Sequence, residues 1–211
     1  NLKLNRMKTL SIFSLLLVLS FSSQAQTPNI QWQISLGGSA YDHSNAVVQT
    51  ADSGFIVAGT TNSVDGDVTG NHGYYDCWLV KLSSLGAIQW QKALGGTGED
   101  VARSIIGTFD SGYILIGYTG STDGDVSGNH GSWDAWVVKL DATGTIQWQK
   151  ALGGSGDEIG YSIQQTTDSG YIIAGLSISN DGDVSGNHGS YDAWVAKLTS
   201  TGSIVWQKSL G

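Results

Sequence analysis

The sequence has very little cysteine, proline and positive charge, and each shortage narrows the class of protein. Cys77 is the only cysteine, so no disulfide can form within the chain and this residue is expected to pack as a small buried hydrophobe. One proline beside 30 glycines suits many tight turns between buried strands. Only 10 lysines and arginines stand against 18 acids. We therefore expect neither nucleic acid nor an anionic membrane surface as a partner.

Motifs of common hydrolases and nucleotide-binding enzymes are also missing. Downstream of residue 25 the chain has no G-x-S-x-G, no H-E-x-x-H and no phosphate-cradling glycine loop. Acids do recur after each Leu-Gly-Gly, at Asp42, Asp100 and Glu158. A glycosidase needs two carboxylates across one cleft, whereas these acids lie on connecting segments and are expected to face water. The sequence therefore predicts a protein that is not an enzyme.

The first 25 residues are predicted to be a signal peptide with a few residues upstream of it. Met7 and Lys8 precede an apolar run at 11–23, which is short and rich in serine for a membrane span. Small residues at 23–25 offer a cleavage point, and residues 26–29 would then form a linker. We expect export to a secreted or cell-surface location, without membrane insertion of the mature chain. The alternative is an anchor that is never cleaved.

A repeat of 58 residues organises the rest of the chain. The motif IQWQ or IVWQ occurs four times, placing Trp32, Trp90, Trp148 and Trp206 at intervals of 58 residues without an insertion. Residues 30–211 therefore comprise three 58-residue β repeats plus the start of a fourth. Because the pattern stops within a repeat, we expect the chain to be a fragment of a longer protein.

Each repeat holds four short β-rich runs and no helical pattern. In the middle repeat, residues 101–109 and 113–118 are separated by Asp110-Ser111-Gly112, a hairpin signal in which the glycine is expected to supply a positive φ. Residues 135–140 and 145–152 indicate a second hairpin. The inner runs are apolar on both faces, as in strands buried between two sheets, whereas IQWQK alternates like a half-exposed edge strand.

Four antiparallel strands per repeat, stacked on similar repeats, form the plan of a β-propeller blade. We therefore predict an all-β fold of four-stranded antiparallel blades. Three blades are fewer than the roughly four to eight of a closed ring, and residues 30–36 lack partner strands, so the predicted arrangement is an open three-blade arc. Trp78, Trp136 and Trp194 are predicted to pack between neighbouring blades. The alternative is a threefold β-trefoil or β-prism, which explains the three repeats but not the orphan strand.

The repeat also resembles a known family. The segments GGSGDEIGYSI, TDSGYIIAG, YDAWVAKL and TGSIVWQKSLG are similar to the bacterial β-propeller repeat family known as SBBP, and the resemblance covers residues 30–211. It rests on the positions of glycine, tryptophan and the Lys-Leu pair. The resemblance implies a scaffold found in exported and surface proteins rather than a reaction. These repeats are longer than a common propeller blade, and an acidic loop accounts for much of the excess.

The acidic loop recurs almost unchanged and is the main candidate site. It is DGDVTGNHGYYD at 65–76, DGDVSGNHGSWD at 123–134 and DGDVSGNHGSYD at 181–192. Acids at loop positions 1, 3 and 12, a hydroxyl at 5 and glycine at 6 match the ligand and turn positions of a calcium loop. The predicted calcium ligands are Asp65, Asp67, Thr69 and Asp76; Asp123, Asp125, Ser127 and Asp134; and Asp181, Asp183, Ser185 and Asp192.

Two features of the loop depart from a calcium loop. Position 12 is Asp, which reaches less far than Glu, and strands rather than helices flank the loop. A purely structural turn network is the first alternative, since Asp, Gly, Ser and Asn occur in any turn, and recognition of a partner is the second. Zinc binding by His72, His130 and His188 would require the three loops to converge. A hydrogen bond from each histidine that pins its loop is expected instead.

These patterns together predict a binding function. The leading hypothesis is a non-enzymatic exported repeat scaffold that presents loops for binding at the cell surface or outside the cell, stabilised by calcium. Its partner would be a protein or glycan that the sequence does not identify. The alternative is a carbohydrate-binding lectin, and a hydrolase comes third.

Overall fold

The computed structural model describes residues 28–211 of the chain. The predicted signal peptide, residues 1–25, lies outside the described residues. The chain divides into two compact units at residues 1–31 and 32–211, and the architecture below is that of the second unit. Within residues 28–211 there are strands but no helix, and so no helical segment suited to crossing a membrane.

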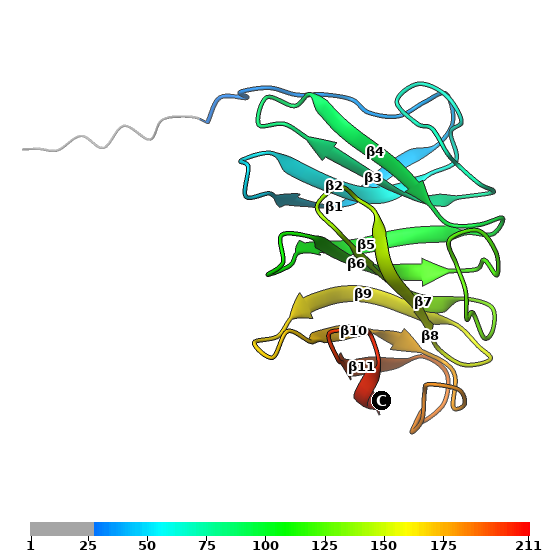
Figure 1. The fold of residues 1–211 in the computed structure, drawn as a ribbon. Helices are drawn as coiled ribbons and strands as arrows, with labels where there is room; N and C mark the ends of the chain where they lie inside the picture. The colour runs from blue at the N-terminus through cyan, green and yellow to red at the C-terminus, as the bar shows by residue number, and fades with distance from the viewer. Residues whose placement is uncertain (1–27) are drawn as a thin grey trace, which may run out of the picture. The chain divides into compact units, whose positions relative to one another are not determined.

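Three four-stranded antiparallel sheets, called blades 1, 2 and 3 from here on, follow one another along the chain (Figure 1). Blade 1 consists of β1 (Asp42–Gln49), β2 (Phe55–Thr61), β3 (Asp76–Leu82) and β4 (Ile88–Leu94). Blade 2 consists of β5 (Asp100–Gly107), β6 (Tyr113–Thr119), β7 (Asp134–Leu140) and β8 (Ile146–Leu152). Blade 3 consists of β9 (Glu158–Gln165), β10 (Tyr171–Ser177), β11 (Asp192–Leu198) and β12 (Ile204–Leu210). In every blade the strands lie side by side in sequence order.

This topology confirms the predicted all-β fold of an open arc of three blades. No sheet in residues 28–211 closes into the barrel that a β-trefoil requires. The sheets also do not surround one axis as in a β-prism, because the core clusters between blades join blade 1 to blade 2 and blade 2 to blade 3. The last residues of the chain, which start a fourth sequence repeat, form β12 and complete blade 3. Residues 32–36 carry the same outer-strand motif but belong to none of the described sheets. The blades are therefore out of phase with the repeats counted from IQWQ.

The burial of the strands follows their place in the blade. All seven residues of β7 are buried, whereas β8 at the outer edge alternates between half-buried and exposed before its last two residues. This matches the predicted distinction between inner strands that are apolar on both faces and an outer IQWQK strand. The indole N–H of Trp136 in β7 donates a hydrogen bond of 2.8 Å to Oε1 of Gln149 in β8. The motif thus satisfies the one polar atom of a buried tryptophan.

The first hairpin of each blade differs in one detail from the sequence prediction. Gly112 was expected to supply the positive φ, but Ser111 adopts it at 66°, as Ser53 and Ser169 do in the other blades. Oδ1 of Asp110 accepts the N–H of Gly112 at 3.2 Å, which closes the turn around the serine. Glycine is needed for a different reason, because a Cβ at position 112 would lie 2.3 Å from the carbonyl oxygen of Leu140.

A lysine, buried in blades 1 and 2 and half-buried in blade 3, connects the two hairpins of each blade. Lys139 is almost fully buried in β7, and its Nζ donates to Oδ2 of Asp110 at 2.8 Å and to Oε1 of Gln147 at 3.0 Å. Lys81 with Asp52 and Lys197 with Asp168 repeat the ion pair in the other two blades. A buried ammonium is costly unless it is paired and hydrogen-bonded. The recurring Lys-Leu pair and the Asp-Ser-Gly turn are therefore two parts of one contact.

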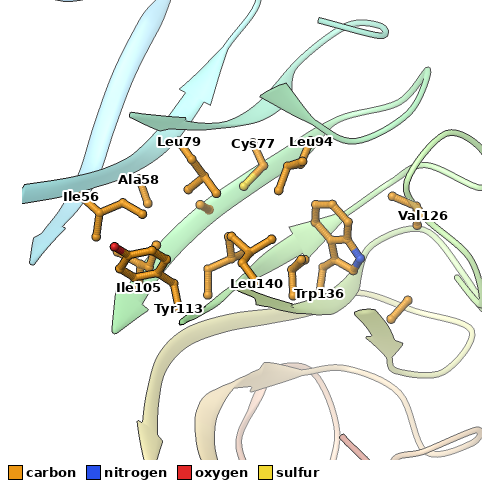
Figure 2. Close-up of a cluster of buried hydrophobic side chains, with 14 residues drawn as sticks. Ile56, Ala58, Cys77, Leu79, Leu94, Ile105, Tyr113, Val126, Trp136 and Leu140 are labelled. Carbon is orange, nitrogen blue, oxygen red and sulfur yellow. The ribbon is translucent and has the colours of Figure 1, made fainter. Parts of the chain in front are cut away.

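The hydrophobic core lies between consecutive blades. At the first junction, Ile56, Ala58, Cys77 and Leu79 of blade 1 pack against Ile105, Tyr113, Leu115 and Trp136 of blade 2, and Figure 2 shows side chains of the two blades pointing toward one another. The second junction uses the same positions 58 residues later, with Ile114, Ile116, Ala135 and Val137 facing Ile163, Tyr171, Ile173 and Trp194. Trp136 and Trp194 are 0% and 1% exposed. Their predicted packing between blades is confirmed, as is the burial of Cys77. Trp78 was expected to pack in the same way, but it is buried against Val68, Val80 and Leu82 of its own blade.

We predict that Trp136→Ala lowers the free energy of unfolding by about 3–5 kcal/mol, the cost of removing a large aromatic side chain from a packed core. Trp206→Ala is the matched control, because Trp206 carries the outer-strand motif and is 47% exposed. Urea denaturation followed by circular dichroism measures both variants. Equal and small losses in the two variants would contradict the placement of Trp136.

Candidate functional site

The three acidic loops connect the second and third strands of their blades and lie along the same edge of the three blades (Figure 1). Each loop curves over the Leu-Gly-Gly segment that leads into its own blade. In blade 2, the N–H of Asp125 donates to the carbonyl oxygen of Gly95 at 2.8 Å. Gly124 and Gly128 both have positive φ, at 65° and 84°, which gives the loop its tight curvature.

The acids at loop positions 1 and 3 accept hydrogen bonds from that glycine segment. Oδ1 of Asp123 accepts the N–H of Thr97 at 2.8 Å, and Oδ2 of Asp125 accepts the N–H of Gly95 at 3.3 Å. The same bonds recur from Ser39 to Asp65, from Gly37 to Asp67, from Ser155 to Asp181 and from Gly153 to Asp183. The backbone bonds from Ser39 and Ser155 hold the pKa values of Asp65 and Asp181 below the usual range.

Loop positions 5 and 12 face other partners. Oγ of Ser127 accepts a hydrogen bond of 2.6 Å from the amide of Gln149 in β8. Asp134 is fully buried, and its Oδ2 accepts the backbone N–H of His130 at 2.9 Å and contacts Nδ1 of the same histidine at 2.8 Å. Thr69 and Asp76 in blade 1, and Ser185 and Asp192 in blade 3, make the equivalent bonds.

The expected histidine contact is therefore confirmed. Nδ1 of His72, His130 and His188 lies 2.7, 2.8 and 3.0 Å from the position-12 carboxylate of its own loop. Each bond spans the second half of the loop and holds it in place. The three histidines belong to three different blades.

The four predicted calcium ligands of one loop do not converge in this arrangement. Each of the four side chains accepts a hydrogen bond from a different donor through one of its oxygens, and no set of three or more His, Cys, Asp or Glu side chains within residues 28–211 is placed to hold a metal ion. The backbone N–H groups of Thr97 and Gly95 bond Oδ1 of Asp123 and Oδ2 of Asp125, which leaves the second oxygen of each carboxylate outside these two bonds. Calcium binding by the loops stays a prediction.

Instead, the structure groups position 12 of one loop with acids of the next blade. A Cβ on Gly153 would lie 2.6 Å from Oδ1 of Asp134 and 2.4 Å from Oε2 of Glu158, so the two carboxylates approach each other across this glycine. Asp183 and Asp181 accept hydrogen bonds from the N–H groups of Gly153 and Ser155 in the same segment. Residues of two blades therefore build each acidic cluster, whereas the sequence suggested one loop alone.

Asp100 and Glu158 are also placed differently from the sequence prediction. They were expected to face water, yet both are 0% exposed at the two blade junctions. The N–H of Asp100 donates to the carbonyl oxygen of Tyr75 at 2.7 Å, and that of Glu158 to the carbonyl oxygen of Trp133 at 2.6 Å. These backbone hydrogen bonds between blades place the two acidic residues in the buried junctions. Serine and threonine hydroxyls and glycine N–H groups then satisfy them, including Ser121 for Asp100 and Gly154 for Glu158.

The junction changes the acidity of position 12. Oδ1 of Asp76 and Oδ1 of Asp134 are buried without a hydrogen-bond partner. Burial raises the pKa of Asp76 and of Asp134, and the neighbouring charges of Asp100 and Glu158 raise them further. At the equivalent position of blade 3, the backbone bond from His188 lowers the pKa of Asp192. The pKa at loop position 12 is therefore raised where the following blade covers the carboxyl, at Asp76 and Asp134, and lowered at Asp192.

A polar cleft opens beside each junction. The first has a volume of about 390 Å³ and the second about 490 Å³. The first is lined by residues that include Thr69, His72, Gln91, Lys92 and Asp125, and the second by their equivalents Ser127, His130, Gln149, Lys150 and Asp183. In both, the loop and outer strand of one blade face the position-3 acid of the next. The clefts therefore present the same chemistry twice.

Blades of four antiparallel strands, repeated along the chain, are those of a β-propeller-type repeat protein. No protein-family model matches the chain, and a comparison with curated proteins gives no match either. The resemblance to the SBBP repeat family thus rests on the sequence motifs, and the functional argument rests on the loops and clefts.

We predict that, with a chelator present, the buried carboxyls at the junctions lower the free energy of unfolding as the pH rises above about 5, where the carboxyls with lowered pKa values are ionised in both states. Asp76, Asp100 and Asp134 have folded-state pKa values above the unfolded value, which is about 3.9. Between the two values the folded state holds more protons than the unfolded state, so raising the pH favours unfolding. Urea titrations at a series of pH values measure the slope.

Asp134→Asn should flatten this slope without loss of stability at pH 7. Its amide oxygen can accept the bond from His130 while its NH₂ group donates toward Glu158, where Oδ1 now lacks a partner. Asp192→Asn is the matched control. Its pKa is lowered in the folded state, so its ionised form stabilises the fold above pH 4 and the substitution should reduce stability at pH 7. Identical behaviour of the two variants would count against the junction effect.

Proposed function

We propose that the protein is a non-enzymatic, exported repeat scaffold that presents its loops for binding at the cell surface or outside the cell. The observation that carries this proposal is the pair of equivalent clefts with the same lining residues, one at each blade junction. An active site usually brings residues with different catalytic roles together in one place, whereas here the same set of polar side chains occurs at two places. A ligand with a repeating structure could occupy both clefts, and the second contact would gain from the high effective concentration.

The lining of the clefts favours an extended polar ligand. His130 and Lys150 offer hydrogen-bond donors on one side of the second cleft, and Asp183 offers an acceptor on the other. Such groups suit peptide amides as well as sugar hydroxyls. A lectin is therefore the second candidate, and the exposed rings of Tyr74 and Tyr191 in the loops favour it because aromatic faces can stack on sugars.

Calcium is proposed as a stabilising ion of the loops. Support comes from the density of acids, since Asp181 and Asp183 meet Asp134 and Glu158 around a single glycine segment. Carboxylates gathered in this way repel one another unless a positive charge or a proton lies among them. Because position 12 is a short Asp and strands rather than helices flank each loop, we expect weak affinity of roughly 0.1–1 mM, as in extracellular modules.

For the scaffold proposal we predict that a glycan array shows no binding that free sugar can compete, while added calcium raises the melting temperature. A lectin would give the opposite result on the array. Lys92→Ala with Lys150→Ala alters both clefts without removing a hydrogen bond that holds a loop, and serves as the matched variant if a glycan binds. Loss of glycan binding in this variant, with the melting temperature retained, would replace the scaffold by the lectin.

For calcium, isothermal titration of the folded chain up to about 10 mM calcium should show binding, because this concentration is well above the expected Kd. At ten times Kd, each independent site would stabilise the fold by RT ln 11, or about 1.4 kcal/mol. Asp123→Asn with Asp125→Asn removes the charges of one loop out of three, so the stabilisation by calcium should fall by about a third. The amide oxygens can still accept the backbone hydrogen bonds, so the loop should keep its fold. Absence of uptake would leave the loops as turn networks.

A further inference from the structure

The first strand of every blade contains a β-bulge, and the residue in the bulge differs from blade to blade. The pairing of β5 with β6 shifts between Ala102 and Ser104, which leaves Arg103 outside the register. The same shift leaves out Asn45 in β1 and Tyr161 in β9. A bulge bends its strand and re-aims a side chain, and bulges are frequent beside binding sites. The repeat therefore provides one redirected position per blade and fills it with three different side chains.

A glycine opposite the bulge fixes this geometry. Gly117 pairs with Ala102, and a Cβ on Gly117 would lie 1.7 Å from the carbonyl oxygen of Val101. Gly59 and Gly175 face the other two bulges with the same close approach. The bulge is thus part of the blade itself, and the direction in which Arg103 leaves β5 follows from the fold.

Arg103 has no anionic partner in the part of the chain that the structure describes. It is the only arginine among residues 28–211. Its Cζ lies 5.6 Å from the ring centroid of Tyr118 and 6.0 Å from that of Tyr161, so two aromatic rings attract the guanidinium and limit its movement. Nε is buried without a hydrogen-bond partner, and no salt bridge among residues 28–211 includes Arg103. A charged donor in this state is costly unless a ligand bonds to it.

A pocket of about 320 Å³ lies beside Arg103, between blades 1 and 2. The ring of Tyr41 is stacked on that of His43 at 6.1 Å and meets the ring of Tyr75 edge-on at 6.0 Å, so these three side chains form an aromatic wall. Tyr41 is 54% exposed, which makes the wall accessible from solvent. We call this site the Arg103 pocket; its lining includes Tyr41, His43, Asn45, Tyr75, Glu99 and Arg103.

The Arg103 pocket is not repeated at the second junction. One repeat later, Glu99 and Val101 stand in place of Tyr41 and His43. Trp133 stands in place of Tyr75, and its ring lies 5.0 Å from that of Tyr118. The second junction therefore lacks this aromatic wall, whereas the two polar clefts have equivalent linings. A ligand of the Arg103 pocket is recognised once along the chain.

The charges of the pocket suit a ligand with one negative charge. Glu99 lies in the same pocket, and its Oε1 accepts the hydroxyl of Tyr118 at 2.8 Å. A phosphate dianion would be repelled by Glu99, whereas a carboxylate can take two parallel N–H donors from Arg103. The NH₂ group of Asn45 already donates to the carbonyl oxygen of Ala102 at 2.7 Å, so its amide oxygen faces the ligand as an acceptor. The pocket thus combines a carboxylate-binding group with acceptors for a neighbouring N–H.

We propose that the Arg103 pocket binds the C-terminal carboxylate of a partner protein, with the last side chain of that protein against the aromatic wall. The terminal amide N–H of the ligand then donates to Asn45 or Glu99. A chain end occurs once per ligand and suits a pocket that occurs once, whereas a polysaccharide of repeated units suits the repeated clefts. The Arg103 pocket shares no residue with those clefts, so this inference goes beyond the proposed function and does not rest on it.

Nuclear magnetic resonance titration of the folded, ¹⁵N-labelled chain with a blocked dipeptide tests the proposal. The probe is N-acetyl-glycyl-phenylalanine, which has a free carboxylate and an aromatic last side chain. We expect a Kd of roughly 0.1–1 mM for a ligand of this size. The Nε–H signal of Arg103, identified by its absence in Arg103→Gln, should shift on binding. The same dipeptide with a C-terminal amide should bind about tenfold or more weakly, because it lacks the charge that Arg103 binds.

Three variants separate a binding role from a structural one. Arg103→Gln should weaken binding of the free acid to the level of the amide, and Arg103→Lys should retain part of it as a point charge without the paired donors. Tyr41→Ala should weaken binding of the phenylalanine probe but not of N-acetyl-glycyl-glycine. Lys150→Ala, which lies in the second polar cleft, is the matched control and should leave the Kd unchanged. Circular dichroism checks the fold of each variant.

Equal affinities for the free acid and the amide would overturn the proposal. So would an unchanged Kd in a folded Arg103→Gln variant, or no binding of the free acid at about 10 mM, well above the expected Kd. Tighter binding of glucuronic acid than of the dipeptide would replace the protein C-terminus by an acidic sugar. Each of these failures would leave the proposed roles of the loops and clefts untouched, because the titration probes different residues.

Discussion

The packing of each blade against the next is the contact on which this fold depends. The third strands of the blades have nearly the same sequence, yet their burial differs with their neighbours. All seven residues of β3 and of β7 are buried, whereas β11 alternates between buried residues and residues that are half-buried or exposed. A strand that is apolar on both faces buries both only when sheets lie on both sides. The 58-residue unit therefore stabilises itself mainly through its neighbours, as in other repeat proteins.

The contact between blades also sets the pKa of the carboxyl at position 12 of each loop. A carboxylate at position 12 of the loop is hydrogen-bonded to its own histidine in all three blades, but only Asp76 and Asp134 are also covered by the acid of a following blade. Removal from water disfavours the charged form and the neighbouring charge adds to this effect. The pKa of the position-12 carboxyl therefore depends on whether another blade packs against its own. The sequence of a single repeat does not contain this information.

Binding surfaces also arise between repeats rather than within them. Each cleft combines the hydroxyl and histidine of one loop with the position-3 acid of the next, so three loops give two clefts. The loops lie along one edge of the blades (Figure 1), and residues of the loops line both clefts. A scaffold of this kind can gain affinity by repetition, and each added junction would add both stability and one more cleft.

The sequence by itself determined the period, the strands, the all-β blades and the burial of Trp136 and Trp194. These features depend on which residues alternate or recur within one repeat, and that information is local. The tertiary structure alone decided that Ser111 rather than Gly112 takes the positive φ, because the carbonyl group that excludes a Cβ at Gly112 comes from β7. It also decided that Asp100 and Glu158 are buried and that Asp134 meets Glu158 rather than Asp123 and Asp125. Which residues become neighbours depends on how one blade is placed against the next. Repeats with nearly the same sequence do not encode that placement.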